Sequence, residues 1–114
     1  LFGCQVFGRQ MLEQGCGSII NISSASAGPP LSKAFTYSVA KAGIKNLTQN
    51  VAREWATQGV RVNAIRPGFF PTKWSIKKFI TPEEVADTIV FMASSSAMTG
   101  QVVTLDGGFT LKFA

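Results

Sequence analysis

The sequence contains no histidine and only two cysteines, so it offers few of the side chains that hold metal ions. Cys4 and Cys16 lack the close spacing of a metal-ligand pair, and we expect no metal and two free, reduced thiols in a cytoplasmic protein. No apolar run approaches the ~20 residues of a transmembrane helix, so we expect no membrane partner. The start, LFGCQVFGRQ, has neither the features of a signal peptide nor a methionine, which is typical of a fragment or a trimmed chain.

Charged residues are also few. They make up 15% of the chain and apolar residues 46%, a balance that predicts a folded protein with a well-buried core. The net charge of +5 raises the question of nucleic-acid binding. The basic residues are scattered, however, and the one local cluster, KWSIKK at 73–78, is more typical of a solvated loop than of a continuous basic face. We therefore expect no nucleic-acid partner.

What the sequence does contain is an alternation of helical and strand patterns. Apolar residues recur at helical spacing over 34–58, and residues 1–14 also predict a helix. A third helix is predicted after Thr81, where Pro82 and Glu84 complete the pattern of a capping box. Short, nearly continuous apolar stretches predict three strands, over 18–23, 60–66 and 101–106.

This alternation predicts a three-layer α/β fold. Strands that are apolar on both faces are typical of a parallel sheet covered by helices on each side. We expect the three strands to lie side by side in sequence order, joined by right-handed crossovers. At 114 residues and with no linker, the chain forms one domain, 1–114, at most.

One short motif, YSVAK, carries a chemical hypothesis. Tyr37 and Lys41 are four residues apart in a predicted helix, so they lie on one face. An ammonium near a phenol favours the phenolate and lowers the tyrosine pKa from about 10. Such a tyrosine can exchange a proton with an alcohol or a carbonyl. A half-buried tyrosine beside a solvated lysine is the alternative, and the five residues alone favour it.

The surroundings of the motif favour the chemical reading. The strand 18–23 is followed by Ser24, at the carboxyl edge where parallel sheets place their ligands. The strand 60–66 ends in Pro67-Gly68, a turn at the same edge.

Three stretches together resemble the carboxyl-terminal half of the short-chain dehydrogenase/reductase family. They are GSIINISS, YSVAKAGIKNLTQNVAREWATQGVRVNAIRPG and TGQVVTLDGG, in the family's order and spacing. The resemblance runs from Leu1 to about Phe109 and implies a partial Rossmann-like, NAD- or NADP-binding domain.

The resemblance also implies roles for individual residues. Tyr37 would be the general acid/base, and Lys41 would hold the nicotinamide ribose and lower the tyrosine pKa. Ser24 would bind the substrate oxygen, with Ser23 and Ser26 as alternatives by position.

The nicotinamide itself would lie against a second group of residues. The turn Pro67-Gly68 would run along it, Phe70 would contact its carboxamide through the backbone, and Thr72 would lie near the carboxamide and the pyrophosphate. Pro67-Gly68 also reads as no more than a turn that ends a strand.

Two features depart from the family. The glycine-rich turn that holds the pyrophosphate is missing, since GCGSII precedes a strand and not a helix. The residue that selects NAD or NADP would belong to that missing half, and the family's catalytic asparagine would fall just before Leu1. The family also has a longer, substrate-covering segment before the PEEVA helix, where only 73–80 remain here. Either this segment is short or sequence has been lost near Thr81.

Two functions follow from the resemblance. The first is an NAD(P)-dependent oxidoreductase that transfers hydride between the nicotinamide and a small hydroxy or keto substrate. RPGFFPTKW most resembles the branch that acts on sugar acids. The second is a non-catalytic half-domain that folds and associates without turnover. The sequence gives neither the substrate, nor the preferred cofactor, nor the direction of reaction.

Association is a further expectation. The family commonly pairs two helices across a two-fold axis, and these correspond to 1–14 and 34–58, so we expect a homo-oligomer. Both helices carry more apolar surface than one sheet face covers, with Phe2, Phe7, Met11 and Trp55 as candidates for the excess.

Overall fold

The computed structural model describes residues 2–23, 35–68 and 80–108, and for Phe2 and residues 35–41 it describes the backbone alone. The elements follow one another as α1 (Phe2–Gln14), β1 (Gly17–Ile22), α2 (Phe35–Trp55), a short 3-10 turn η2 (Ala56–Gln58), β2 (Val60–Pro67), α3 (Pro82–Ser94) and β3 (Val102–Leu105). The predicted helices and strands are confirmed, with ends that differ by one or a few residues.

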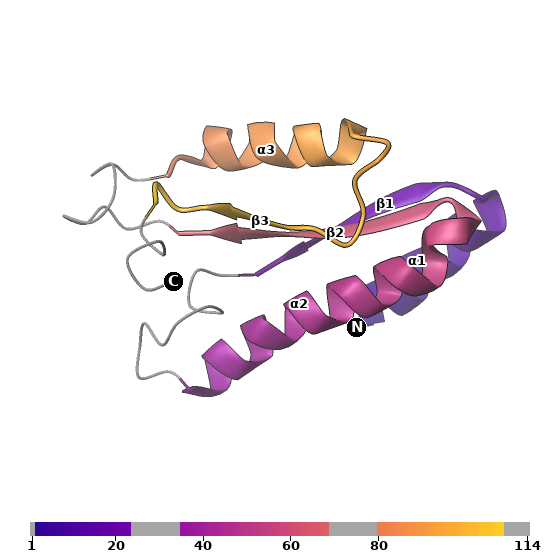
Figure 1. Ribbon diagram of the computed structural model, residues 1–114, viewed down its shortest axis with the longest axis horizontal. Coiled ribbons are helices and arrows are strands. Elements are labelled where there is room, and N and C mark those ends of the chain that lie inside the picture. Colours follow the sequence, from indigo (N-terminus) through magenta and orange to yellow (C-terminus); the bar gives the residue numbers. More distant parts are fainter. Residues whose placement is uncertain (1, 24–34, 69–79, 109–114) are drawn as a thin grey trace.

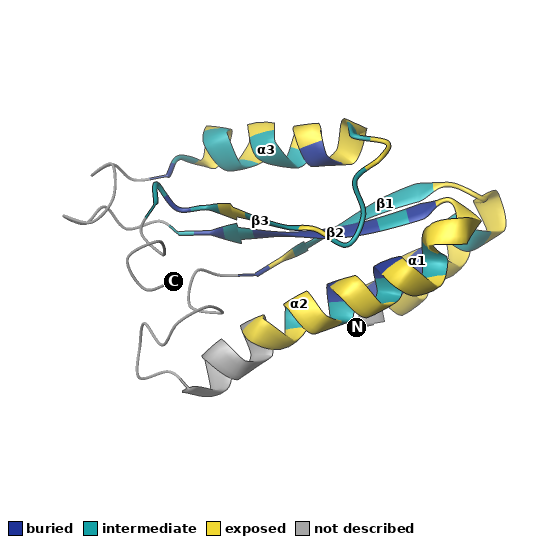
Figure 2. Cartoon of the chain, in the orientation of Figure 1, coloured by how far each residue is buried: buried dark blue, intermediate teal, exposed yellow. Residues whose placement is uncertain are grey.

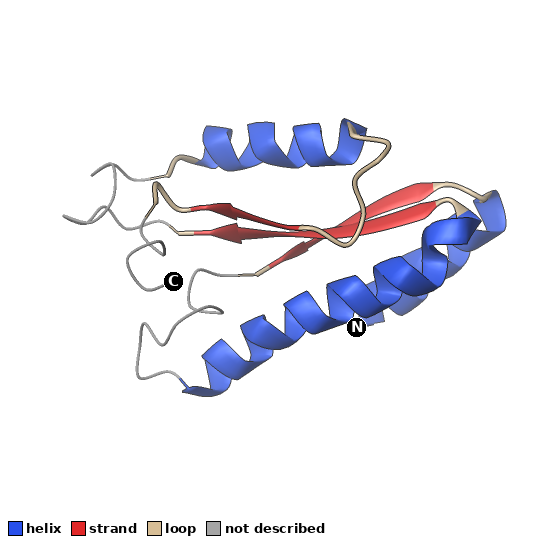
Figure 3. Cartoon of the chain, in the orientation of Figure 1, coloured by secondary structure: helices blue, strands red, loops and turns tan. Residues whose placement is uncertain are grey.

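The three strands form one parallel sheet in the order β1-β2-β3 (Figure 3). Ile19 lies beside Val62, and Ala64 beside Val102. The predicted order and direction of the strands are therefore confirmed. Helices α1 and α2 cover one face of the sheet and α3 covers the other (Figure 1), which is the predicted three-layer arrangement.

The core lies along β2, the middle strand. Val60 and Val62 are buried against Ala52 of α2, and Met11, Leu12, Ile19, Val51 and Trp55 pack around them. Figure 2 shows β2 as the most continuously buried element of the sheet. Its sequence, VRVNAIRP, is buried at six of eight positions, and the buried Asn63 is among them, so both faces of the strand are covered.

Helix α2 faces the sheet with smaller residues than its periodicity suggests. Thr48 and Ala52 are its deepest described positions, whereas Leu47 and Trp55 are half-buried. Small side chains let the helix approach the strands closely, and the large ones lie along its flanks. One flank contacts α1, where a side chain on Gly8 would collide with the Trp55 ring.

The apolar excess expected on these two helices is only partly present. Phe7 is 64% exposed, and its neighbour Val6 is 65% exposed. Met11 and Trp55 instead pack against the core. Both are partly buried there, so they leave less free apolar surface on the two helices than expected. The side chain of Phe2 lies outside the described part.

Helix α3 begins with the predicted capping box. The Glu84 amide donates to Thr81 Oγ1 at 3.1 Å, and the Thr81 amide donates to Glu84 Oε1 at 3.0 Å. These reciprocal bonds satisfy two of the amides that a helix start leaves without partners.

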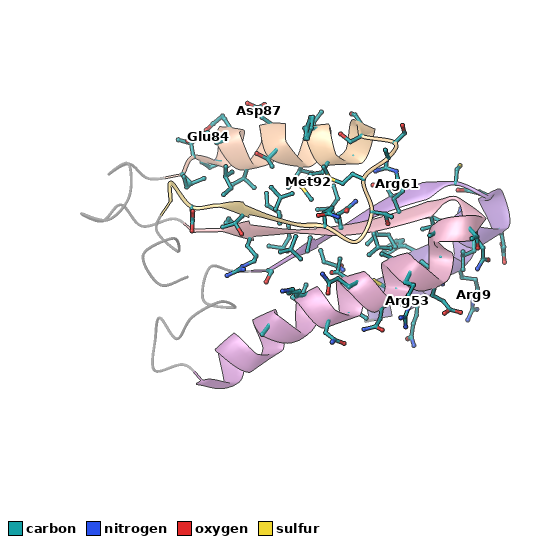
Figure 4. The ribbon with its side chains drawn as sticks, viewed as in Figure 1. Arg9, Arg53, Arg61, Glu84, Asp87 and Met92 are labelled. Carbon is teal, nitrogen blue, oxygen red and sulfur yellow. The ribbon has the colours of Figure 1, made fainter. Side chains whose placement is uncertain are left out.

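The other end of α3 is held by Arg61 of β2 (Figure 4). Its guanidinium donates to four carbonyl oxygens: those of Met92 at 3.1 Å, Ala93 at 2.6 Å, Ser95 at 2.8 Å and Met98 at 3.3 Å. A cation beside unpaired carbonyls at a helix end is favourable, because the helix dipole places negative charge there. One side chain thus attaches α3 to the sheet.

Buried Asn63 continues this attachment toward β3. Its Nδ2 donates to the Met98 carbonyl at 2.9 Å, and its Oδ1 accepts from the Gln101 amide at 3.1 Å. The connection from α3 to β3 is therefore fixed by side chains of β2.

Replacing Arg61 by Met is expected to lower the free energy of unfolding by about 2 kcal/mol or more, since hydrogen bonds to charged groups contribute ~1.5–3 kcal/mol each. Met keeps the apolar stem and removes the donors. Urea unfolding followed by circular dichroism measures the change, with Arg9→Met at an exposed position of α1 as the matched control. Equal stabilities of the two variants would contradict this role for Arg61.

Candidate active site

The carboxyl ends of the three strands lie at one edge of the sheet, because all three are parallel (Figure 1). Pro67 at the end of β2 lies beside Leu105 at the end of β3, and Ile22 at the end of β1 lies beside Ile65. The first turns of α2 and α3 lie at the same end of the molecule (Figure 1). This edge is where open parallel sheets bind ligands.

Helix α2 brings the YSVAK motif to this edge. The helix begins at Phe35, so Tyr37 lies in its first turn and Lys41 one turn later, on the same side. The helical spacing on which the chemical hypothesis depends is therefore present. Their side chains lie outside the described part, so the roles given to them stay predictions.

The turn after β2 is attached to its neighbour. Pro67 is buried, and the Gly68 amide donates to the Leu105 carbonyl at 2.9 Å, which extends the pairing of β2 with β3 by one residue. Pro67-Gly68 thus holds a fixed place at the carboxyl edge. Phe70 and Thr72 follow it and lie outside the described residues.

Of the three candidate serines, only Ser23 is described. Its side chain is buried, and its amide donates to the Ile65 carbonyl at 2.8 Å, so it continues β1 at the sheet edge. Ser24, the preferred candidate, and Ser26 lie outside the described part of the chain.

Two residues that the sequence analysis did not single out join the elements that carry the motif. Asn21 on β1 donates from Nδ2 to Oγ1 of the fully buried Thr48 on α2, at 3.0 Å. Cys4 of α1 contacts Asn21 Oδ1 at 4.0 Å. This polar contact sets α2 against β1, the strand that leads to the serines. An asparagine inside an apolar strand was the available signal.

Asp106 is a third residue that the sequence analysis did not single out. It is buried at the end of β3, and its Oδ1 accepts from the Gly108 amide at 2.9 Å. The carboxylate thereby shapes the glycine turn that closes β3 at the carboxyl edge.

The start of α3 bears on where the phosphates of a nicotinamide dinucleotide could bind. Phosphates need a helix start with free amides, and α3 does not provide one. Its start is closed by the capping box and carries Glu83 and Glu84 in the first turn, which repel anions. The start of α3 is therefore a poor site for a pyrophosphate, and the residues predicted for the nicotinamide end stay a prediction.

Among the residues that the structure describes, no group of three or more histidine, cysteine or acidic side chains is placed to hold a metal ion. No helix in the described ranges is long and apolar enough to cross a membrane. Cys4 and Cys16 are free thiols, the first buried and the second exposed.

Comparison with known proteins gives a consistent picture. A family model described as short chain dehydrogenase matches residues 1–83, and one described as enoyl-(acyl carrier protein) reductase matches 72–110. The chain is 38% identical to an uncharacterized oxidoreductase, UxuB, of Bacillus subtilis, over 92% of this chain and 47% of that protein. It is 35% identical to galactitol 2-dehydrogenase of Rhizobium johnstonii, over 96% of this chain and 52% of that protein.

Solved structures agree in three dimensions. The acetoin dehydrogenase YohF of Salmonella typhimurium superposes with a TM-score of 0.87 at 34% identity, over 95% of this chain and 49% of that one. A gluconate 5-dehydrogenase of Burkholderia cenocepacia, solved with NADP and tartrate, gives a TM-score of 0.88 at 26% identity. The chain belongs to the short-chain dehydrogenase/reductase family.

The chain spans about half the length of the curated relatives it matches. Its alignments with UxuB and galactitol 2-dehydrogenase are 131 and 134 positions long, more than its own 114 residues. The relatives therefore contain residues within the matched region that this chain lacks. The shortened segment expected at 73–80 falls largely outside the described residues and stays a prediction.

Replacing Thr48 by Val is expected to lower stability by about 1–3 kcal/mol, the penalty for leaving a buried polar group, here the Asn21 amide, without its partner. Val has nearly the same shape, so packing is preserved. Adding Asn21→Leu should restore part of the loss, because both partners are then apolar. Thr104→Val at an exposed position of β3 is the matched control in thermal unfolding. If the stability loss of the double variant equals the sum of the losses of Thr48→Val and Asn21→Leu, a direct interaction between the two side chains is contradicted.

Proposed function

We propose that this chain forms the nicotinamide-binding and proton-transferring half of an NAD- or NADP-dependent oxidoreductase, acting on a small hydroxy or keto compound in the cytoplasm. The observation that carries the proposal is the position of Tyr37 and Lys41. They lie one helical turn apart at the start of α2, at the edge where three parallel strands end.

The proposed roles follow from this arrangement. Tyr37 gives a proton to the substrate oxygen during reduction and takes it back during oxidation. Lys41 keeps the phenol acidic enough for that exchange and holds the ribose hydroxyls. Ser24 donates a hydrogen bond to the substrate oxygen. A bound nicotinamide dinucleotide supplies or accepts the hydride, and Pro67, Gly68, Phe70 and Thr72 would hold its nicotinamide end.

A polyol or sugar acid is the substrate class that we favour. Among the relatives at 35–36% identity are galactitol 2-dehydrogenase, D-threitol dehydrogenase and NAD-dependent glycerol dehydrogenase, all named for polyols. A gluconate 5-dehydrogenase among the solved structures adds a sugar acid. NADH in one solved relative and NADP in another support a nicotinamide cofactor and leave the choice between the two open.

We also propose a homo-oligomer formed through α1 and α2. The exposed Val6 and Phe7 on α1 support this, since large apolar side chains exposed next to one another are typical of an interface. Met11 and Trp55 play no part, because they pack within the chain.

A chimera tests the catalytic roles. This chain replaces the matched region of the Rhizobium johnstonii galactitol 2-dehydrogenase, and the relative supplies the rest. We expect Tyr37→Phe to reduce turnover by about 10²–10⁴-fold, the usual contribution of a general acid/base. The rise in melting temperature on adding NADH should remain.

Two lysine variants of the same chimera are measured beside Tyr37→Phe. Lys41→Met should weaken both turnover and dinucleotide binding, and Lys45→Met, one turn further along α2 at an exposed position, should change neither. Full turnover by the Tyr37→Phe chimera would rule out the acid/base role and favour the non-catalytic alternative.

The 114-residue chain alone is expected to bind NADH or NADPH at millimolar concentration or more weakly. The start of α3 is closed by its capping box, the glycine-rich turn of the family is missing, and each lost charge-assisted hydrogen bond is worth about 1.5–3 kcal/mol. Since ~1.4 kcal/mol is tenfold in affinity, losing three or four such bonds moves a micromolar site to millimolar or beyond. Isothermal titration calorimetry measures this. Micromolar binding would reveal a phosphate site elsewhere in the chain.

A further inference from the structure

The burial of helix α2 begins well after the YSVAK motif. Of the side chains that the structure describes on this helix, 42–55, Thr48 is the first that is buried, and Ala52 follows one turn later. Between 42 and 47, Ile44 and Leu47 are half-buried and the other side chains are exposed. Toward its amino-terminal end the helix diverges from the strands (Figure 1). Among the described side chains, Thr48 is therefore the first deep contact with the sheet after the motif.

Thr48 makes this contact through a directed bond. Asn21 Nδ2 of β1 donates to Oγ1 of the fully buried Thr48 at 3.0 Å. The other end of the Asn21 amide is engaged as well, since Cys4 Sγ of α1 donates to its Oδ1 at 4.0 Å. A hydrogen bond weakens steeply as its angle departs from linearity, whereas an apolar contact has no preferred direction. The Asn21–Thr48 bond therefore resists a tilt of α2 as well as its separation from β1.

The length of helix beyond this bond amplifies any tilt. Tyr37 precedes Thr48 by eleven residues of α2, which is about 16 Å at ~1.5 Å per residue. Over that length, a tilt of ~4° about Thr48 moves the backbone of Tyr37 by about 1 Å. A misplacement of this size reduces catalysis by about 10²-fold in enzymes that depend on a positioned group. A small change at Thr48 is thus large enough to matter at the candidate site.

We propose that Thr48 and Asn21 are positioning residues, whose hydrogen bond sets the angle of α2 against β1 and thereby the place of Tyr37 at the carboxyl edge. Neither side chain touches substrate or cofactor, and both act through the elements that carry the candidate residues. The angle of α2 is a property of the fold alone. Its effect on turnover rests on the proposed function.

Four variants separate position from stability. Thr48→Val keeps the shape of the side chain and removes the acceptor, and Thr48→Ser keeps the acceptor at the loss of a methyl group. Thr48→Val combined with Asn21→Leu regains stability through an apolar contact, which does not fix an angle. Met92→Ala is the control for lost stability with the bond intact, because Met92 is fully buried on α3, across the sheet from α2.

The angle of α2 is measured in the 114-residue chain, without cofactor, by residual dipolar couplings of its backbone amides. With Thr48→Val, we expect the couplings of 37–47 to require a helix that is tilted by ~4° or more against the strands, or a wider range of angles. The double variant should behave in the same way. Thr48→Ser and Met92→Ala should keep the original angle.

Turnover is measured in the chimera with the Rhizobium johnstonii galactitol 2-dehydrogenase, with galactitol and NAD. We expect kcat to fall by about 10-fold or more with Thr48→Val and with the double variant. The dissociation constant of NADH should change little, because the relative's part of the chimera holds the pyrophosphate. Thr48→Ser and Met92→Ala should keep most of the turnover, although their melting temperatures fall.

The positioning role is overturned if α2 keeps its angle in Thr48→Val, if Thr48→Ser fails to keep it, or if kcat follows the melting temperature across the four variants. An unsubstituted chimera without turnover would contradict the proposed function instead. The angle of α2 in the 114-residue chain then decides by itself whether Thr48 and Asn21 position the helix.

Discussion

Every other described element of this protein depends on the burial of β2. The strand lies between β1 and β3 and is covered by α1 and α2 on one face and by α3 on the other. A strand in this position has to be apolar where it faces the helices, and its polar side chains need partners. Arg61 and Asn63 meet that condition by binding backbone carbonyls in the last turn of α3, and carbonyls and an amide beyond it.

The position of the candidate active site follows from the parallel sheet around β2. Because the strands are parallel, their carboxyl ends share one edge, and α2 starts there with Tyr37 and Lys41 one turn apart. The Asn21–Thr48 bond fixes α2 against β1, and the Gly68 amide fixes the end of β2 to β3. These contacts lie behind the site and touch no substrate. They hold the elements that carry the proposed catalytic residues, and small displacements of such elements reduce catalysis strongly.

The described strands β1 and β2 differ in how far they are buried. Six of the eight residues of β2 are buried, whereas the residues of β1 are half-buried or exposed. For cofactor binding, candidate residues are proposed at the nicotinamide end, and the start of α3 is closed to a pyrophosphate by its capping box. The chain belongs to the short-chain dehydrogenase/reductase family and spans about half the length of the members it matches.

The sequence by itself determined the element order, the parallel sheet, the capping box at Thr81 and the spacing of the YSVAK motif. These depend on local periodicity, end signals and short-range spacing, which a single sequence displays directly. Only the tertiary structure decided which side chains meet across elements. It packed the partly buried Trp55 and Met11 against the core, made Thr48 and Ala52 the most deeply buried described positions of α2, and brought Arg61 to the end of α3. Such pairings join residues that are distant in the sequence, and they depend on how closely two surfaces approach, which periodicity does not encode.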